Sequence, residues 1–289
     1  MKKKTSTEGT ALEDIFDIAG KTVILTGAGG FFGRYIAEGL LSVGAKIILL
    51  ARSNRLAAQA AEYKKKYGDD KVDFRLVDFI DTPKLEAVFK DICSKHRIDV
   101  LINNAHDMTI KSGFNTDAGR VENVTRETWM AAQEGPLWAA IATKHVAANF
   151  LKHGTKGSIV NVASMYGHFG PSPKLYAGTD KFNPAAYGSA KAALMQFTRY
   201  IAEYYGAKGI RCNSISPGPF PNVEESKQGG NTVQKADPFI ERLRDRTSLH
   251  EVGHPRQLVG AIIFLASNAS SYVTGADIPV DGGWTISRG

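Results

Sequence analysis

A tyrosine and a lysine four residues apart are the residues in this chain best suited to proton chemistry. Tyr187 and Lys191 stand in Tyr-Gly-Ser-Ala-Lys, at the start of a segment with helical periodicity. Side chains at this spacing lie on one face of a helix. An ammonium group favours the phenolate, so we expect Lys191 to lower the pKa of Tyr187 from its ordinary value of about 10. Such a phenol could exchange a proton with a substrate hydroxyl near neutral pH.

A glycine-rich turn suggests a second kind of chemistry, the binding of phosphate. The apolar run at 22–27 leads into TGAGGFFG (26–33), and an amphipathic segment follows. Glycines permit a tight turn and the close approach of a pyrophosphate, and a helix N-terminus offers unpaired N–H groups. After a first strand, the turn predicts a dinucleotide site; a glycine turn without a ligand is the alternative. The contacts expected here are Gly27, Gly30, Phe32 and Gly33.

The end of the second apolar run bears on the choice of dinucleotide. Enzymes that prefer NAD usually carry an acidic residue there, whereas this chain has Ala51 followed by Arg52. A guanidinium can pair with a 2′-phosphate that a carboxylate would repel. We therefore favour NADP(H) over NAD(H), with a solvent-facing Arg52 as the alternative. Asp78 could accept from the adenine amino group or cap a helix. The cofactor contacts expected at the third and fourth strand ends are Asp78, Phe79, Asn104 and Ala105.

Short apolar runs alternate with longer amphipathic segments along the whole chain. Nearly continuous apolar runs are typical of strands covered on both faces, and the alternation predicts a doubly wound α/β fold, a parallel sheet with right-handed crossovers and helices on both faces. Strands are expected at 22–27, 46–51, 73–78, 99–105, 157–164, 209–218 and 276–283, and helices at about 31–43, 55–67, 83–95, 126–152, 185–206, 236–246 and 256–267.

Two polar stretches interrupt this alternation, at 106–125 and 217–235. Both follow predicted strand ends, where open α/β sheets bind ligands. The second is a candidate substrate lid, with a mobile surface loop as an equal alternative. We expect residues 1–18 to form a partly flexible tail and residues 19–289 a single domain with a substrate loop at about 217–253.

The composition excludes several classes of protein. Of the 289 residues, 43% are hydrophobic and 22% charged, as in ordinary globular proteins, and no apolar run reaches the length of a membrane span. Cys93 and Cys212 are expected as free thiols in a reducing cytoplasm. The net charge of +7 is not gathered into a basic stripe, which favours an anionic cofactor or substrate over nucleic acid. No metal site is expected.

Taken together, the motifs resemble those of the short-chain dehydrogenase/reductase family in its small, single-domain form, over about residues 15–286. The resemblance implies a Rossmann fold with a seven-stranded parallel sheet and an active site of Ser164, Tyr187 and Lys191. It also implies that Lys191 holds the nicotinamide ribose, that Pro217 and Gly218 lie beside the nicotinamide, and that the chain forms a homotetramer or homodimer. The motifs are Thr26-Gly27…Gly33, Asp78, Asn103-Asn104-Ala105, Ser164, Tyr187…Lys191, Asn213…Ser216-Pro217-Gly218 and Val280-Asp281-Gly282-Gly283.

The expected function is the NAD(P)-dependent interconversion of an alcohol and a ketone or aldehyde. Three departures from the family pattern leave alternatives open. Phe31 gives the glycine turn the spelling of extended members that include nucleotide-sugar epimerases, so an epimerase or dehydratase is one alternative. Pro136 stands near the place of an asparagine that serves proton relay in the family, so a non-catalytic nucleotide-binding protein is another. His106 replaces a glycine, which predicts a displaced loop or a place in the cofactor pocket.

The stretch between Ser164 and Tyr187 is longer than usual for the family. The two residues are 23 positions apart, against roughly 13 in typical members. The added residues should fold beside the active site, and a similar insertion occurs in branches that resemble sugar and polyol dehydrogenases. Polar side chains there would suit a hydroxylated substrate, although packing is the default role for the tyrosines. The substrate contacts expected are His168, Tyr176, Phe220 and Asn222.

Overall fold

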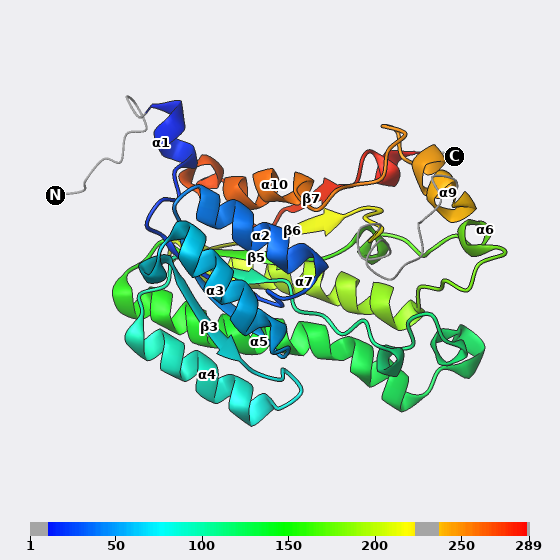
Figure 1. Ribbon diagram of the computed structural model, residues 1–289, viewed down its shortest axis with the longest axis horizontal. Helices are drawn as coiled ribbons and strands as arrows, with labels where there is room; N and C mark the ends of the chain where they lie inside the picture. Colours follow the sequence, from blue (N-terminus) through cyan, green and yellow to red (C-terminus); the bar gives the residue numbers. More distant parts are fainter. Residues whose placement is uncertain (1–10, 223–236, 288–289) are drawn as a thin grey trace.

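Seven parallel strands form one sheet at the centre of the molecule, as the alternation of elements predicts (Figure 1). The computed structural model describes residues 11–222 and 237–287. The strand order is β3-β2-β1-β4-β5-β6-β7, so the direction of winding reverses between β1 and β4, where such sheets bind ligands. The strands are β1 Thr22–Thr26, β2 Lys46–Ala51, β3 Val72–Leu76, β4 Val100–Asn103, β5 Ser158–Val162, β6 Arg211–Pro217 and β7 Asp277–Val280.

Helices cover both faces of the sheet and bury a separate apolar cluster on each (Figure 1). On one face, α2, α3 and α10 pack against the strands through residues such as Leu40, Leu56 and Ile262. On the other face α4, α5 and α7 do so, through residues such as Phe89 and Phe150. The helices are α1 Leu12–Phe16, α2 Phe31–Ser42, α3 Arg55–Tyr67, α4 Thr82–Lys95, α5 Arg126–His153, α6 Pro173–Tyr176, α7 Ala185–Gly206, α9 Pro238–Arg246 and α10 Gln257–Ala266.

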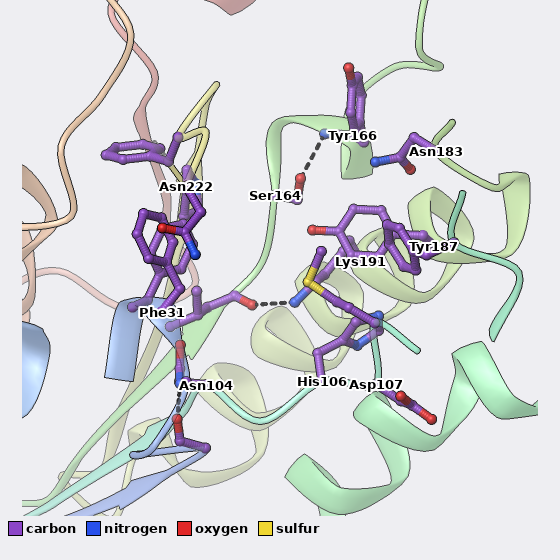
Figure 2. Close-up of a pocket in the computed structure, with 18 of the residues that line it drawn as sticks. Phe31, Asn104, His106, Asp107, Ser164, Tyr166, Asn183, Tyr187, Lys191 and Asn222 are labelled. Carbon is purple, nitrogen blue, oxygen red and sulfur yellow. Dashed lines mark hydrogen bonds between the residues drawn. The ribbon is translucent and has the colours of Figure 1, made fainter. Parts of the chain in front are cut away.

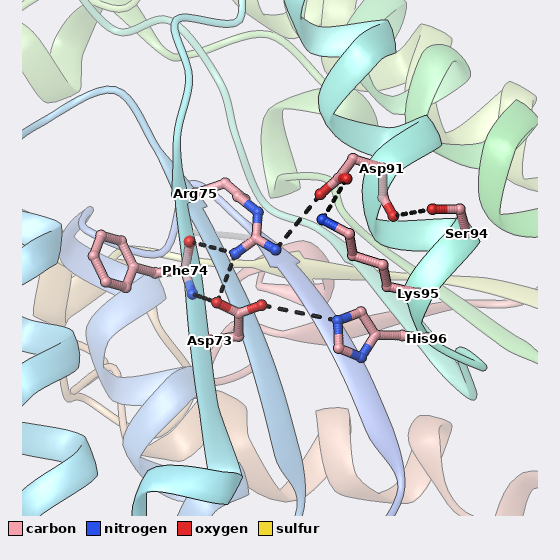
Figure 3. Close-up of polar contacts among 7 residues, drawn as sticks. All are labelled: Asp73, Phe74, Arg75, Asp91, Ser94, Lys95 and His96. Atoms are coloured by element: carbon pink, nitrogen blue, oxygen red, sulfur yellow. Dashed lines mark hydrogen bonds and ion pairs between the residues drawn. The ribbon is translucent and has the colours of Figure 1, made fainter.

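Charged side chains occupy the free edge of the sheet at β3 (Figure 3). Arg75 Nη1 lies 2.6 Å from Asp73 Oδ1, and Arg75 Nη2 lies 3.7 Å from Asp91 Oδ2 on α4. Lys95 Nζ lies 2.6 Å from the other oxygen of Asp91, and His96 Nε2 lies 3.9 Å from Asp73 Oδ2. Charges at an edge strand discourage pairing with the edge of another sheet.

The main differences from the predicted boundaries lie at glycines, prolines and loops. The strand expected at 276–283 ends at Val280, because Gly282 and Gly283 turn the chain with φ values of 63° and 81°. The helix expected from residue 236 begins at Pro238, after an Asp237 cap that accepts from the N–H of Phe239. The stretch expected as a loop at 106–125 contains three short 3₁₀ turns.

The two segments expected to be mobile are only partly described. Most of the candidate lid, from residue 223 onward, lies outside the described residues, as do residues 1–10 of the expected tail. The rest of that tail forms α1, whose Phe16 ring lies 6.4 Å from the ring of Phe264. Ile18 is buried, so the chain joins the core before residue 19. Among the described residues, no helix is both long enough and apolar enough to cross a membrane.

Candidate active site

A cavity of about 920 Å³ lies at the carboxyl ends of the central strands and gathers nearly all the predicted site residues. Of the residues expected from the sequence, Gly33 and His168 are the two that do not line it. The expected residues that line it are Gly27, Gly30, Phe32, Arg52, Asp78, Phe79, Asn104, Ala105, Ser164, Tyr176, Tyr187, Lys191, Pro217, Gly218, Phe220 and Asn222.

Asn104 holds the glycine turn in place through two side-chain hydrogen bonds. The Asn104 side-chain amide donates to the carbonyl oxygens of Thr26 and Gly27, at 3.1 Å and 3.0 Å. Gly27 has a φ of 66°, and a Cβ there would lie 2.9 Å from the Ala105 Cα. A Cβ on Gly33 would lie 2.2 Å from the Gly27 carbonyl oxygen, so Gly33 seats α2 against the turn instead of lining the cavity. The bare backbone before the α2 N-terminus fits a dinucleotide pyrophosphate.

One end of the cavity, where the sequence predicts the adenine half of the cofactor, has an exposed arginine and a carboxylate. Arg52 lines the cavity, and within the described residues its side chain makes no hydrogen bond or ion pair, which leaves it available to a phosphate. Asp78 Oδ1 accepts from the N–H of Ile80 at 3.2 Å, so one of its oxygens stabilises the turn before α4. The centroid of the Phe79 ring lies 5.4 Å from that of the Trp138 ring, and both residues line the cavity.

Tyr187, Lys191 and Ser164 come together at the middle of the cavity, as predicted (Figure 2). The first two turns of α7 supply Tyr187 and Lys191, and Ser164 follows β5. Lys191 Nζ donates to the Val162 carbonyl oxygen at 2.8 Å and lies 5.6 Å from the Tyr187 ring centroid. In Figure 2 the Tyr187 hydroxyl lies beside Ser164, whose own hydroxyl accepts a hydrogen bond from the Tyr166 N–H at 3.2 Å. A substrate oxygen between these hydroxyls could contact both.

The ionisation of the tyrosine differs from the prediction. Burial raises the pKa of Tyr187 to about 12; a hydrogen bond with Ser164 acts in the opposite direction, and Tyr176 adds to the increase. Burial also lowers the pKa of Lys191 to about 7. The expectation that Lys191 lowers the pKa of Tyr187 is therefore wrong for the protein without dinucleotide, because burial raises that pKa and Lys191 is not among the groups that shift it. At a pKa of about 12, the phenol is protonated at neutral pH.

The added stretch before Tyr187 forms one wall of the cavity, as expected from its length. Tyr166 and Tyr176 share a hydrogen bond of 2.8 Å between their hydroxyl groups. Asn183 also lines the wall, and its side-chain oxygen is buried with no hydrogen-bond partner among the residues that the structure describes. His168 is a correction, because its imidazole lies outside the lining and pairs with Asp277 at 2.9 Å.

The other expected substrate contacts lie on the opposite wall. Phe220 packs 5.4 Å from the Phe32 ring, and a Cβ on Gly253 would lie 2.4 Å from it, so Phe220 serves packing as well as lining. Asn222 also lines the cavity.

Motif reasoning missed Phe114, Lys181 and Asn183 as lining residues and left the place of His106 open. Phe114 and His106 flank the Tyr187 ring, at centroid distances of 5.0 Å and 5.1 Å. Of the two predictions for His106, a place in the pocket is correct. Phe114 lies in the polar stretch 106–125. The one feature of the sequence that pointed to a lining residue there was the position of this stretch after a predicted strand. Lys181 and Asn183 also line the cavity. The signal for them in the sequence was the unusual length of the segment between Ser164 and Tyr187.

Comparison with known proteins agrees with this geometry. A family model described as enoyl-(acyl carrier protein) reductase, of the short-chain alcohol dehydrogenase type, matches residues 30–285. An NADP-dependent mannitol dehydrogenase of Hypocrea jecorina is 32% identical over 95% of this chain and 96% of its own. A sorbose reductase of Candida albicans is 29% identical over 94% of this chain and 89% of its own.

A solved structure gives the same result. The gluconate 5-dehydrogenase of Burkholderia cenocepacia, in complex with NADP and tartrate, superposes with a TM-score of 0.78 and 25% identity, over 95% of this chain and 98% of its own. These relatives support an oxidoreductase and not the alternatives of a nucleotide-sugar epimerase or a non-catalytic protein. The chain therefore belongs to the short-chain dehydrogenase/reductase family and is an NAD(P)-dependent oxidoreductase.

Proposed function

We propose that this enzyme interconverts a secondary alcohol and a ketone on a sugar or polyol. The observation that carries the proposal is the convergence of Ser164, Tyr187 and Lys191 on one wall of the cavity. The glycine turn, Arg52 and Asn104 would hold the dinucleotide, whose nicotinamide supplies or takes the hydride when bound. The protein contributes proton transfer and positioning.

Each of the three residues has one role in this proposal. Ser164 donates a hydrogen bond to the substrate oxygen and orients the carbonyl. Tyr187, with a pKa of about 12, gives its proton to that oxygen during reduction and takes it back during oxidation. Lys191, held by the Val162 carbonyl oxygen, stabilises the phenolate that forms and would bind the nicotinamide ribose. One proton enters from solvent for each carbonyl reduced.

The polar groups on the cavity wall support a hydroxylated substrate. The unpartnered side-chain oxygen of Asn183 can accept from a substrate hydroxyl, and the paired hydroxyl groups of Tyr166 and Tyr176 can exchange hydrogen bonds with one. Asn222 on the opposite wall is a further candidate contact. The mannitol, sorbose and gluconate enzymes among the relatives act on compounds of this kind by name.

The substitution Tyr187→Phe tests the function. Turnover of a panel of polyols and ketoses, followed by the absorbance of the reduced nicotinamide, should fall by about 10²- to 10⁴-fold with dinucleotide binding unchanged. Tyr200→Phe is a matched control, because Tyr200 is on the same helix but is exposed. Undiminished turnover in Tyr187→Phe, or wild-type inactivity on the whole panel with both dinucleotides, would contradict the proposal.

The preference for NADP(H) is also a proposal and rests on Arg52. A charge-assisted hydrogen bond contributes about 1.5–3 kcal/mol, so Arg52→Ala should weaken NADP binding by roughly ten- to a hundredfold and leave NAD binding unchanged. Titration calorimetry with both dinucleotides measures this. Equal effects on the two dinucleotides, or tighter binding of NAD by the wild type, would overturn the preference.

Assembly as a homotetramer or homodimer and a cytoplasmic location are further proposals carried by the family resemblance. Light scattering on the purified full chain measures the first: a monomeric mass at micromolar concentration would contradict it. Imaging of a tagged full chain in cells measures the second.

A further inference from the structure

An ion pair on the cavity wall has no place in the roles assigned so far. Lys181 lies between α6 and α7, Asp237 caps α9, and both residues line the cavity. Lys181 Nζ lies 3.2 Å from Asp237 Oδ2, and the two side chains are 39% and 32% exposed. Because both groups line the cavity and stay partly exposed, a molecule inside it can reach the ammonium and the carboxylate together.

Phe239 on α9 holds both members of this pair. Lys181 Nζ lies 4.3 Å from the centroid of the Phe239 ring. The Phe239 N–H donates to Asp237 Oδ1 at 2.8 Å, which leaves the other carboxylate oxygen to Lys181. Burial opposes the ionisation of Asp237, but the Phe239 N–H and Lys181 together lower its pKa below the ordinary value, so the carboxylate is charged at neutral pH. The wall therefore presents a donor group and an acceptor group side by side.

Other contacts already join the segments that carry this pair, so cohesion of the fold does not require it. Figure 1 shows α6 and α9 beside one another. Arg242 Nε on α9 donates to the Leu175 carbonyl oxygen on α6 at 3.0 Å. The rings of Tyr176 and Phe239 lie 5.6 Å apart, and Leu175 and Phe239 belong to one buried apolar cluster. An ion pair between partly exposed groups adds little stability to such contacts.

A row of contacts along the wall connects the pair to the proposed reacting groups. The Tyr166 N–H donates to Ser164 Oγ, and the Tyr166 hydroxyl shares a hydrogen bond with that of Tyr176. The Tyr176 ring packs on the Phe239 ring, which Lys181 Nζ contacts in turn. Three aromatic side chains therefore separate Ser164 from Lys181 along this row. A substrate whose reacting carbon lies beside Ser164 would meet Lys181 with a more remote part.

A donor beside an acceptor matches neighbouring hydroxyl groups better than a carboxylate. A hydroxyl group both donates and accepts, so two adjacent hydroxyls can accept from Lys181 and donate to Asp237. A carboxylate only accepts, and the charge of Asp237 would repel it. Asn183, two residues from Lys181, makes the same demand, because its buried side-chain oxygen lines the cavity without a partner in the described part of the chain.

The lysine and arginine residues that line the described part of the cavity leave no unpaired cation for a substrate carboxylate. These residues are Arg52, Lys181 and Lys191. In the proposed function Arg52 and Lys191 bind the dinucleotide, and Lys181 is paired with Asp237. A sugar acid would enter with its charge uncompensated, at a cost that a neutral polyol does not have.

We propose that Lys181 and Asp237 form a subsite for two neighbouring hydroxyl groups remote from the reacting carbon, and that this subsite selects neutral alditols and ketoses over sugar acids. Lys181 and Asp237 are thus specificity-determining residues. The inference rests on the proposed function, because it assigns a substrate class to the same cavity. Asn183 accepts a hydrogen bond from a further hydroxyl of the same substrate.

Two substitutions separate this role from a structural one. Asp237→Asn keeps the cap of α9 and replaces the charged acceptor with an amide donor, whereas Lys181→Met keeps the length of the side chain and removes its donors. The readout is kcat/KM of the full chain at saturating dinucleotide. The substrates are three six-carbon alditols, D-glucitol, D-mannitol and galactitol, and the aldonate that corresponds to each. The best alditol and its own aldonate are then compared in every variant.

Loss of a hydrogen bond to a partly exposed charged group corresponds to about a tenfold change, so both variants should lower kcat/KM for the alditol by about that factor. For the aldonate, Asp237→Asn should raise kcat/KM about tenfold because the repelling charge is gone, whereas Lys181→Met should lower it. The ratio of aldonate to alditol turnover should therefore rise about a hundredfold in Asp237→Asn and should not rise in Lys181→Met. A lost structural clamp would change both variants alike, and that result would overturn the proposal.

Lys174→Met and Asp245→Asn are matched controls. Lys174 lies on α6 and Asp245 on α9, and both are exposed and outside the cavity lining. Both controls should keep the wild-type ratio of aldonate to alditol turnover. Calorimetry with the dinucleotide checks that each variant is folded. If a variant does not fold, the wild-type comparison decides, and a higher kcat/KM for the aldonate than for the alditol refutes the proposal.

The outcomes for the two proposals are distinct. A wild type without turnover of any alditol, ketose or sugar acid refutes the proposed function. A wild type with turnover that favours sugar acids, or whose preference shifts equally in Lys181→Met and Asp237→Asn, refutes the subsite alone.

Discussion

Burial of Lys191 predicts a measurable dependence of stability on pH in the protein without dinucleotide. The side chain is 5% exposed, and desolvation lowers its pKa from 10.5 to about 7. In the unfolded chain the lysine keeps its ordinary pKa and therefore binds a proton more tightly than in the folded state. Between these two pKa values, the free energy of unfolding must rise with pH.

The size of the effect follows from the two pKa values. Lys191 is half neutral in the folded protein at pH 7 and fully neutral at pH 9, while the unfolded chain stays protonated. Summed over this interval, the free energy of unfolding should increase by about 2 kcal/mol. Above this interval Cys93 opposes the trend, because burial raises the pKa of its thiol to about 11. The interval from about pH 7 to 9 is therefore the informative one.

Urea unfolding of the wild type and of Lys191→Met at pH 7 and pH 9 measures the effect. Methionine has nearly the same length and no charge, and both proteins share every other titrating group. The wild type should gain about 2 kcal/mol over Lys191→Met between the two pH values. A difference between the proteins that does not change with pH would show that Lys191 keeps its charge when buried, and the reasoning would fail.

Three other predictions concern the glycine turn, the apolar core and the cysteines. Gly33→Ala places a Cβ 2.2 Å from the carbonyl oxygen of the glycine turn and should weaken NADP binding at least about tenfold in calorimetry, whereas Gly206→Ala, with nothing within 4 Å, should bind as the wild type does. Phe89 is fully buried, so Phe89→Ala should cost about 3–5 kcal/mol in urea unfolding, and a loss below about 1 kcal/mol would contradict its core position. Burial raises the pKa of the Cys212 thiol, so a thiol reagent at pH 8 should label Cys212 only after urea unfolds the chain, whereas the half-buried Cys93 should react sooner; rapid labelling of Cys212 in the native protein would contradict its burial.

The sequence predicts features that depend on residues close together in the chain, and it misses features that depend on residues far apart in the chain. The glycine turn and the Tyr187–Lys191 spacing are local, and local geometry places them correctly, at the start of α2 and on one face of α7. The prediction for His168 failed because its partner, Asp277, is 109 positions away and draws the imidazole from the cavity. Spacing within a motif carries no information about such a partner.

The proton chemistry shows the same division. Sequence spacing brings an amine near a phenol, and a Coulombic argument then lowers the pKa of the phenol. The pKa values depend instead on how much water the packed chain excludes, and here exclusion raises the pKa of Tyr187 and lowers that of Lys191. For His106, the sequence predicts a displaced loop as readily as a pocket residue. The contact of its ring with Gly135 on α5 decides between these two predictions.

By itself, the sequence determined the fold class, the glycine turn proposed for dinucleotide binding and the three residues proposed for proton transfer, because strand–helix alternation and short motifs encode these over a few residues. The tertiary structure alone decided which side chains face the cavity, which polar atoms there lack partners and which groups hold their protons. Those properties arise from burial and from contacts between segments far apart in the chain, and no local pattern records them.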